Sequence, residues 1–536
     1  MKTYSKLFLL MTLFALFQTM QAQVQRVVRI EGITPGVDTL VYDQIYKAIT
    51  ADAPNRAINN NVVYELKRGQ VYLATSTILA KDFDLYIRAE DGAGTKPIIF
   101  HTKSSSGSSS VFINAQKNLT LENIEFDGKH SDGSVAFRAL SFNGLNCRFI
   151  MLGCWFTCDL SAGINILVDH AKLYVSDCIF GNLGHHISVG GNGRAIDVRA
   201  PNNMDTLIVE NSTFYNLTDR FIRNMAPVID YVKLDHITIA NMQGYHGCVQ
   251  LGKTKKAIIT NNLFANPMIY GDRLTARWRS EQKQPDKAFA VITHDSLSTV
   301  LPSASVEMRN NNIYFDQKFV DFFNETPPND SIVYPRAVSN FITKSLGSDL
   351  TKAYFTEQLT LTNTSSSDLL LDFVTFWVKY PNAGLYPDNW SQIYPYEWDV
   401  SYATTSKSYT AADNGYPVGD LNAFPAMKVK WENGDVLAKS ETKTLDNGLE
   451  INNYPNPFKY QTTIHYSIVK DQKVEVSIYN SYGQKERILI NAFLSEGDYQ
   501  VSWDGTDDSG SEMPKGMYLV QISGSNGVTT KKILKQ

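Results

Sequence analysis

One pattern of apolar and polar positions recurs between residues 119 and 316. Each copy is a short segment of alternating character that ends on an aromatic or aliphatic residue. The copies occupy residues 119–126, 149–156, 173–180, 207–214, 232–239, 257–264 and, less regularly, 306–313. Their ends follow one another at roughly 25-residue steps with loop insertions, which is typical of an array of similar structural units.

Two columns of turn-forming residues accompany the repeat. Three positions before the end of each copy stand Asn123, Gly153, Asp177, Asn211, His236, Asn261 and Asn310, and two positions after it stand Gly128, Cys158, Asn182, Asn216, Asn241 and Asn266. Most of these residue types accept a left-handed backbone or close a bend with a side-chain hydrogen bond. Short strands bent at such positions predict the coils of a parallel β-helix. Leucine-rich repeats share the period, but their LxxLxLxxN pattern is missing.

The same repeat predicts which side chains fill the interior of the β-helix. We expect an internal aromatic stack of Phe126, Phe156, Phe180, Phe214 and Phe264 rather than a sugar-binding platform. Cys154 and Cys178 both stand two positions before the end of a copy, so they should stack in neighbouring coils. They are either buried thiols or one disulfide.

The chain before the repeat predicts a leader and a cap. Lys2 and Lys6 precede an apolar run over residues 7–17, which is shorter than the ~20 residues that span a bilayer and is typical of a secretory signal peptide. Apolar residues at 42, 45, 46 and 49 have the i, i+3, i+4, i+7 spacing of an amphipathic helix. Such a helix would cover the open end of the β-helix.

These patterns predict an all-β protein: a right-handed single-stranded parallel β-helix with a short N-terminal capping helix and a C-terminal immunoglobulin-like β-sandwich. The expected segments are a signal peptide (1–22), cap and first coils (23–118), regular β-helix (119–316), an irregular aromatic-rich part (317–446) and the sandwich (447–536). No segment after the leader is apolar enough to suggest a membrane span. We expect a monomer.

Composition and charge limit the classes of partner and cofactor that the protein could bind. The 536 residues carry 50 Lys and Arg against 54 Asp and Glu, a net charge of -4, which argues against a nucleic-acid-binding protein. Five cysteines show no zinc-binding spacing. The acidic turn at 504–510 lacks the EF-hand spacing, so a solvated turn is favoured over a calcium loop. The sequence assigns no certain cofactor, and Ca²⁺ stays open as one.

The strands that follow the repeats gather charge on one outward patch. They align over residues 139–143, 165–169, 195–199, 221–225 and 248–252. This alignment points Leu140, Ile166, Ile196, Ile222 and Val249 inward and Ser141, Leu167, Asp197, Arg223 and Gln250 outward. Arg138, Arg194 and Arg220 begin their strands in one column, and His185 and His246 lie in adjoining loops.

A guanidinium-rich patch suits a uronic-acid polysaccharide, because guanidinium groups bind carboxylates in a bidentate manner. In β-elimination the uronate carboxylate is neutralised, a base removes the C5 proton and an acid assists the leaving oxygen. Our candidate catalytic residues are Arg220, Arg223, Asp197 and His185. Our candidate substrate-binding residues are Arg138, Arg194, Arg199, Asp219, His246 and Gln250.

Three alternatives stay open for this patch. Asp197 could act as the general acid of a glycoside hydrolase, paired with Asp219 or Asp169. The charges could instead form a solvated ladder of ion pairs that neutralise one another. The protein could also be a non-catalytic glycan-binding or adhesive surface protein.

The N-terminal progression resembles a known superfamily. The segments YELKRGQVY (64–72), LYIRAEDG (85–92) and PIIF (97–100), followed by the first clear repeat, are similar to the opening of pectate-lyase-like β-helices, within the chondroitinase B and alginate lyase branch. Bacteroidetes surface β-helix proteins of undefined activity are also similar. The chondroitinase B resemblance implies a catalytic Lys motif and a calcium-binding Asn and Glu cluster, but we find no matching Lys motif or paired Glu. An Arg follows that Lys in the family, and Arg220 or Arg223 could occupy its position.

The C-terminal end resembles the type A sorting domain of the Bacteroidetes type IX secretion system. The motifs YPNPF (454–458), GDY (497–499), WDG (503–505), KGMYL (515–519) and KKILK (531–535) occur in the family's order. The resemblance implies passage across the outer membrane by the type IX machinery, removal of the tail, and release or attachment to surface lipopolysaccharide. We therefore expect a secreted or cell-surface protein.

Overall fold

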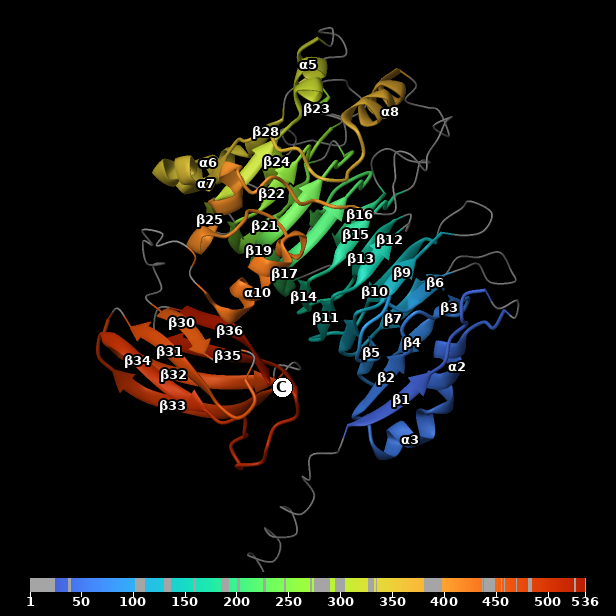
Figure 1. The fold of residues 1–536 in the computed structure, drawn as a ribbon, viewed down its shortest axis with the longest axis vertical. Helices are drawn as coiled ribbons and strands as arrows, with labels where there is room; N and C mark the ends of the chain where they lie inside the picture. The colour runs from blue at the N-terminus through green and yellow to red at the C-terminus, as the bar shows by residue number, and fades with distance from the viewer. Residues whose placement is uncertain are drawn as a thin grey trace, which may run out of the picture. The chain divides into compact units, whose positions relative to one another are not determined.

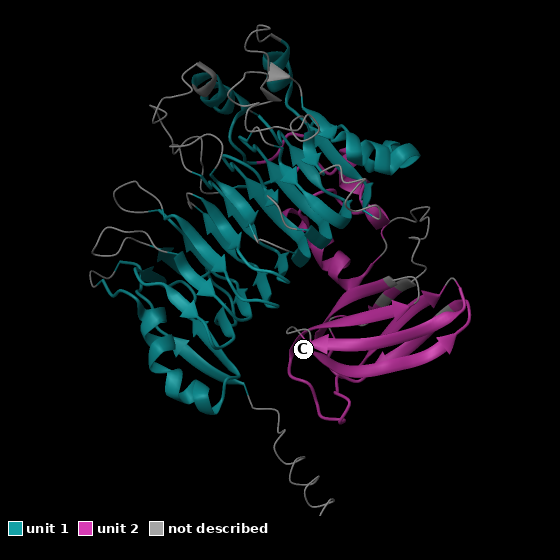
Figure 2. Cartoon of the chain, turned by 180° about the vertical axis from the view of Figure 1, so that it is seen from behind, with its two compact units in different colours: residues 1–358, 363–400 teal, residues 359–362, 401–536 magenta. Residues whose placement is uncertain are grey.

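The computed structural model describes two compact units, one of residues 1–358 with 363–400 and the other of 359–362 with 401–536 (Figure 2). The described residues are 25–36, 40–101, 111–129, 136–157, 161–184, 192–199, 203–224, 228–244, 247–269, 272–273, 290–294, 304–325, 332–333, 335–379, 398–435, 437, 449–454, 456, 458–468, 470–480, 484–524 and 527–535. The predicted signal peptide lies outside them, as do His185, His246 and residues 380–397.

The first unit is built from parallel strands stacked coil upon coil (Figure 1). One stack, called sheet 1 here, contains β4 (Ile78–Ala80), β7 (Val111–Ala115), β10 (Arg138–Phe142), β13 (Ala162–Ile166), β16 (Arg194–Val198), β18 (Ile222–Asn224), β20 (Val249–Gln250), β24 (Ala290–Thr293) and β28 (Arg336–Val338). Each strand pairs in parallel with the corresponding strand of the next coil.

The remaining strands of the coils form one curled sheet, called sheet 2, made of two successive ladders. The first ladder contains β1 (Arg26–Ile30), β2 (Val62–Leu66), β5 (Leu85–Ala89), β8 (Leu119–Glu122), β11 (Arg148–Leu152), β14 (Lys172–Ser176), β17 (Asn203–Tyr215), β19 (Val228–Ala240), β21 (Lys253–Thr260) and β25 (Ser305–Arg309). The second contains β3 (Val71–Ala74), β6 (Ile98–His101), β9 (Glu125–Asp127), β12 (Trp155–Thr157), β15 (Ile179–Gly181), the ends of β17 and β19, β22 (Leu263–Ala265), β26 (Asn311–Tyr314) and β29 (Tyr354–Phe355).

A left-handed residue separates the two ladders in each regular coil. All seven residues of the first predicted column have positive φ: Asn123, Gly153, Asp177, Asn211, His236, Asn261 and Asn310. In the second column Asn182, Asn216, Asn241 and Asn266 also have positive φ, whereas Gly128 does not and Cys158 is outside the described residues. The bend chemistry predicted from sequence is thus confirmed for the first column and for most of the second.

The interior follows the predicted stacking. Phe126, Phe156, Phe180 and Phe214 are buried, and successive ring centroids lie 4.9, 4.6 and 5.1 Å apart with nearly parallel planes. Phe264 is also buried, but Ile239 occupies the coil between it and Phe214. Cys154 and Cys178 are buried free thiols, which selects one of the two predicted alternatives.

Short helices accompany the first unit, in α2 (Gln44–Ala51), α3 (Ala53–Ile58), α5 (Gln317–Glu325), α6 (Asn340–Leu346), α7 (Leu350–Ala353) and α8 (Ser367–Lys379), with the 3₁₀ turn η1 (Gly347–Asp349) and the small antiparallel pair β23 (Asp272–Arg273) and β27 (Ile332–Val333). The predicted capping helix corresponds to α2, which buries Ile45 and Ile49 in the core. Tyr42 and Tyr46 are exposed, so the buried stripe is narrower than predicted. Tyr42 precedes the helix because Asp43 takes a left-handed conformation and accepts hydrogen bonds from Thr75 and Ser76.

The second unit contains an antiparallel β-sandwich. One sheet has the order β30 (Leu449–Tyr454), β31 (Thr462–Ile468), β34 (Gly497–Trp503), and the other β33 (Lys485–Leu494), β32 (Gln472–Asn480), β35 (Gly516–Gly524), β36 (Gly527–Lys535). Trp503 is fully buried between them. Before the sandwich come η2 (Lys407–Thr410), η3 (Asp413–Gly415), η4 (Leu421–Ala423) and α10 (Pro425–Asn433). The predicted all-β class, a parallel β-helix with a C-terminal β-sandwich, is confirmed.

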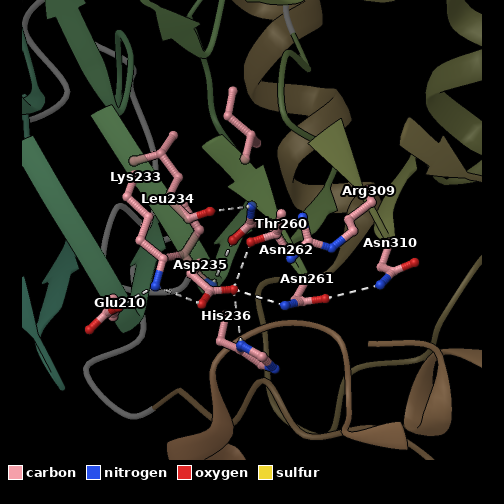
Figure 3. A network of polar contacts seen from close by, with 12 residues as sticks. Glu210, Lys233, Leu234, Asp235, His236, Thr260, Asn261, Asn262, Arg309 and Asn310 are labelled. Atoms are coloured by element: carbon pink, nitrogen blue, oxygen red, sulfur yellow. Dashed lines mark hydrogen bonds and ion pairs between the residues drawn. The ribbon is translucent and has the colours of Figure 1, made fainter. Parts of the chain in front are cut away.

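A polar network holds the bends on the outer side of sheet 2 (Figure 3). Lys233 Nζ lies 2.7 Å from Glu210 Oε1 and 3.2 Å from Asp235 Oδ2. Asp235 Oδ1 accepts hydrogen bonds from Thr260 Oγ1 and Asn261 Nδ2, both at 2.9 Å. Burial alone would raise the pKa of Asp235, but Lys233 and His236 outweigh it and hold that pKa well below its usual range. One lysine thus bridges two carboxylates here, which favours a structural role.

The conformation at Asn261 makes a prediction about stability. Asn261→Gly should lower stability through the lost side-chain hydrogen bonds to Asp235 and Asn310. Asn261→Val loses those bonds too and forces a β-branched residue into the left-handed region, at φ 61°. We expect Val to be less stable than Gly by roughly 1–3 kcal/mol in chemical denaturation. Equal stability of the two variants would show that the bend does not impose this backbone constraint.

Candidate functional site

Sheet 1 carries one continuous outward row of polar side chains. Strand alternation sends Leu140, Ile164, Ile196, Ile222 and Val249 into the core. The positions between them stack in register as Asn114, Ser141, Asn165, Asp197, Arg223, Gln250 and Thr293. The row therefore changes from uncharged side chains at its N-terminal coils to charged side chains in the middle.

The structure corrects one member of the predicted row. Strand β13 covers Ala162–Ile166, whereas the sequence alignment predicted residues 165–169. The alignment placed this strand two residues too late in the sequence, and a shift of two residues changes the register partners without changing which face each side chain is on. Ile166 still points inward, but Asn165 takes the outward position predicted for Leu167.

Asp197 is the centre of a cluster of ion pairs. Its Oδ1 accepts a hydrogen bond from Arg223 Nε at 2.7 Å, and its Oδ2 accepts from Arg223 Nη2 at 2.7 Å. Arg199 Nε donates to Oδ2 at 2.7 Å, and Arg194 Nη1 donates to the same oxygen at 3.3 Å. Three arginines thus converge on a single carboxylate: one begins β16, one follows it, and one lies in β18.

Asp219 extends the cluster toward the next coils. Its Oδ2 accepts from Arg194 Nε at 2.9 Å, and its Oδ1 accepts from Arg220 Nε at 3.1 Å. Arg220 Nη1 in turn donates to Gln250 Oε1 at 2.6 Å. The structure therefore brings seven of the ten predicted site residues into one bonded group: Arg194, Asp197, Arg199, Asp219, Arg220, Arg223 and Gln250.

The cluster is almost entirely buried, and its charges do not balance among the residues that the structure describes. Four guanidinium groups surround two carboxylates, so the group carries four positive and two negative charges, a surplus of two. The Arg199 side chain is 41% exposed, whereas those of the other five ionised residues are buried. Guanidinium groups that lack a full complement of anions are costly to remove from water.

The pKa values of the arginines reflect this surplus. Burial lowers the pKa of Arg194 to about 10, although Asp219 and Asp197 act in the opposite direction, and Arg223 and Arg220 lower it further. Burial also lowers the pKa of Arg223, against the effect of Asp197. Both groups remain cations at neutral pH, but the two aspartates do not offset their desolvation. An additional anion would therefore stabilise the buried guanidinium groups.

The other predicted site residues lie apart or outside the described part of the chain. Arg138 shares a register column with Arg194, as predicted, but Ala162 of β13 stands between them. The Arg138 guanidinium lies 4.3 Å from the ring centroid of Phe137. His185 and His246 are outside the described residues, so their assignments as candidate catalytic and substrate-binding residues stay predictions.

Asn165 is a site residue that the sequence alignment missed. The residue is 1% exposed, and neither its Nδ2 nor its Oδ1 has a hydrogen-bond partner among the described residues. Its register neighbours are Ser141 on one side and Asp197 on the other. A signal was present, because Asn165 alternates with two isoleucines in the sequence, but the alignment placed it opposite Ala139 instead of Ser141, two positions too early in its strand.

A pair of carboxylates that was not among the predicted site residues lies on β9. Glu125 and Asp127 flank the inward Phe126, so both point outward, and Trp155 is the register neighbour of Glu125 in the next coil. Burial raises the pKa of Glu125 to about 7, with a further contribution from Asp127 and an opposing one from Lys96. Burial also raises the pKa of Asp127. Two carboxylates that resist ionisation together can hold a proton near neutral pH.

Metal binding has limited support in the described residues. Across them, no three His, Cys, Asp or Glu side chains gather closely enough to ligate an ion. In the acidic turn of the sandwich, Asp507 Oδ1 accepts hydrogen bonds from the backbone N–H groups of Ser509 and Ser511. These bonds are those of a self-capped turn, as the sequence favoured.

Comparison with known proteins gives one family match, in the second unit. Residues 466–527 match the family model of the FlgD Ig-like domain, which agrees with the observed sandwich. No curated protein matches the chain. A solved structure, dimeric latent PorU from Porphyromonas gingivalis, is similar at 22% identity over 16% of this chain and 9% of that chain, with a TM-score of 0.15. A similarity of this size carries no argument about the fold or function of the chain.

Among the helices that the structure describes, none is both long and apolar enough to cross a bilayer.

The raised pKa of Glu125 predicts a pH-dependent stability. The folded protein holds this proton to higher pH than the unfolded chain, so its stabilising effect is complete below about pH 4 and is lost as the pH rises through about 7. Glu125→Gln cannot ionise. At pH 8.5 it should be more stable than the parent by on the order of 3 kcal/mol, and at pH 4 the two should be equal.

Denaturant melts from pH 4 to 8.5 would measure this difference. Glu496→Gln, at an exposed position of the second unit, is the control and should follow the parent throughout. Parallel stability curves for Glu125→Gln and the parent would contradict a Glu125 that stays protonated in the folded state.

Proposed function

We propose that the arginine cluster of sheet 1 binds the carboxylate groups of a uronic-acid polysaccharide. The observation that carries this proposal is the surplus of two positive charges among four guanidinium groups and two buried carboxylates. A carboxylate is a natural counterion because it accepts two parallel N–H bonds from one guanidinium. The exposed head of Arg199 is the point from which a ligand would reach the cluster.

A polysaccharide fits this site better than a small anion does. The outward row continues over successive coils on both sides of the cluster, through Ser141 and Asn165 in one direction and Gln250 and Thr293 in the other. Coils repeat at about 4.8 Å, so the row offers polar groups at regular intervals along the helix axis. Ser141, Asn165 and Thr293 are themselves buried, so a linear polymer would reach the row at the partly exposed Arg199 and Gln250.

If the site is catalytic, β-elimination is the reaction that its charge favours. Guanidinium groups neutralise the uronate carboxylate and so make the C5 proton more acidic. Hydrolysis by Asp197 and Asp219 has less support, because both oxygens of each carboxylate already accept hydrogen bonds from arginine. A general acid needs an oxygen that faces the glycosidic bond. The competing function is binding without cleavage, as in an adhesive surface protein.

We also propose that the sandwich is an export signal and that the mature protein is secreted or attached to the cell surface. The support is the set of ordered motifs from residue 454 to residue 535 on an Ig-like sandwich that matches the FlgD family over residues 466–527. Type IX secretion machinery would be the partner of this domain. The proposed leader and sorting tail would then flank a β-helix that faces the outside of the cell.

The binding proposal predicts that substitution of Arg199, the exposed arginine of the cluster, weakens ligand binding. Arg199→Gln should weaken binding of an anionic oligosaccharide roughly tenfold or more, because one charge-assisted hydrogen bond is lost. The thermal midpoint should change little, since Asp197 keeps its hydrogen bonds from Arg223 and Arg194. Isothermal titration with oligogalacturonate, oligoalginate and hyaluronan oligosaccharides would measure the change.

Lys172→Gln is the matched control, because Lys172 is an exposed cation on sheet 2, and it should bind like the parent. Absorbance of the unsaturated product in the same samples would report elimination. Binding without product would leave a glycan-binding protein, and no binding of any oligosaccharide by the parent would contradict the proposal.

The export proposal predicts the fate of a truncated chain. Removing residues 447–536 in the native host should leave the β-helix inside the outer membrane, whereas the full chain reaches the medium or the cell surface. Immunoblots of fractionated cells would show this, with a leader deletion retained in the cytoplasm as the control. Surface delivery of the truncated chain would contradict a sorting role for the sandwich.

A further inference from the structure

The outer face of one sheet of the sandwich carries most of that domain's exposed apolar side chains. In the sheet of β33, β32, β35 and β36, buried residues such as Val476, Val520 and Ile533 fill the inward positions, so the alternate positions point outward. Five large apolar side chains are exposed among the described residues of the sandwich. Four of them lie on this face: Ile488, Phe493, Val528 and Leu534. The fifth, Tyr460, lies between β30 and β31.

The charged side chains of this face are mostly lysines. Lys473 is the register partner of Phe493, and Lys532 stands two residues before Leu534 on the same strand. A third lysine, Lys485, pairs with Glu475. The other outward register positions are uncharged: Ser477, Tyr479, Asn491, Met517, Leu519, Gln521, Ser523 and Thr530. Three lysines and one glutamate leave a surplus of two positive charges at these positions.

We propose that this face of the sandwich docks on an anionic lipid surface. Its exposed apolar side chains would enter the boundary between headgroups and acyl chains. The lysine stems would lie along that boundary and place their ammonium groups near the lipid phosphates. The amides and hydroxyls between them can donate hydrogen bonds to the same phosphates.

The composition of the face favours a lipid surface over a protein partner. Lysine is depleted in protein interfaces relative to the rest of a protein surface, whereas basic and apolar side chains occur together where proteins lie on anionic membranes. The inference goes beyond the proposed function, because it concerns the sandwich and needs no sugar ligand.

Vesicle sedimentation tests the proposal on the chain from residue 23, which keeps every described residue and lacks the apolar run of the leader. One set of vesicles is phosphatidylcholine, and the other is an equimolar mixture with phosphatidylglycerol. Because each lysine near an anionic surface contributes roughly fivefold, the anionic vesicles should bind the protein at least tenfold more strongly. This preference should disappear in ~1 M salt, where the Debye length is about 3 Å.

Substitutions locate the binding face. Phe493→Ser should weaken binding to the anionic vesicles at least fivefold, because Phe493 is 71% exposed and supplies apolar area. Lys473→Gln should weaken it roughly fivefold. Tyr460→Ser is the matched control and should bind like the parent: Tyr460 is an exposed aromatic residue with Lys459 Nζ 5.1 Å from its ring centroid, but it lies outside the face. All three variants should melt with the parent, since the substituted side chains are exposed.

Three results would overturn the inference. The first is equal binding of the parent to both kinds of vesicle, or binding to neither. The second is a loss for Tyr460→Ser as large as that for Phe493→Ser. The third is a dimer of the parent in sedimentation velocity without lipid that Phe493→Ser dissociates, which would assign the face to a second copy of the chain. Failure of the oligosaccharide titrations would remove the sugar-binding proposal and leave this inference standing.

Discussion

The parallel backbone ladder holds each side chain of the β-helix about 4.8 Å from its counterpart in the next coil, and the rest of the first unit depends on this spacing. The ladder can close each turn only where the chain bends sharply, which explains the column of left-handed residues from Asn123 to Asn310. It also places side chains of the same type above one another in the core, as in the aromatic series from Phe126 to Phe214. Apolar stacking is favourable at this distance, whereas stacking of like charges is not.

The same spacing creates the electrostatic problem on sheet 1. Arginines from adjacent coils lie close enough to repel one another, and Asp197 and Asp219 are placed where each carboxylate separates several of them. Two carboxylates reduce the repulsion among four guanidinium groups without cancelling it. The network around Asp235 on sheet 2 differs, because its Lys233 meets two carboxylates. The network around Lys233 therefore has no surplus of positive charge among the described residues, whereas the arginine cluster does.

Much of this could be predicted from the sequence, because the signals are local and repeated. The bends at Asn261 and its equivalents depend on residue type alone, and the inward phenylalanines follow from strand alternation. The register of Asn165 was predicted wrongly by two positions, since turn lengths between strands vary and the alternating apolar pattern around residues 162–168 fits two registers. The sequence also could not predict which arginines are buried. Nothing in the residue pattern shows that Arg194 is enclosed while Arg199 reaches solvent.

The most direct test of an anion-binding arginine cluster is a crystal structure of the protein with a bound uronate oligosaccharide. The account predicts a carboxylate within hydrogen-bonding distance of the Arg199 guanidinium, the exposed member of the cluster. Oligosaccharide density elsewhere, with the ion pairs of Asp197 and Asp219 unchanged, would contradict it. In that case the cluster would be a structural ladder whose surplus charge is balanced from within the chain.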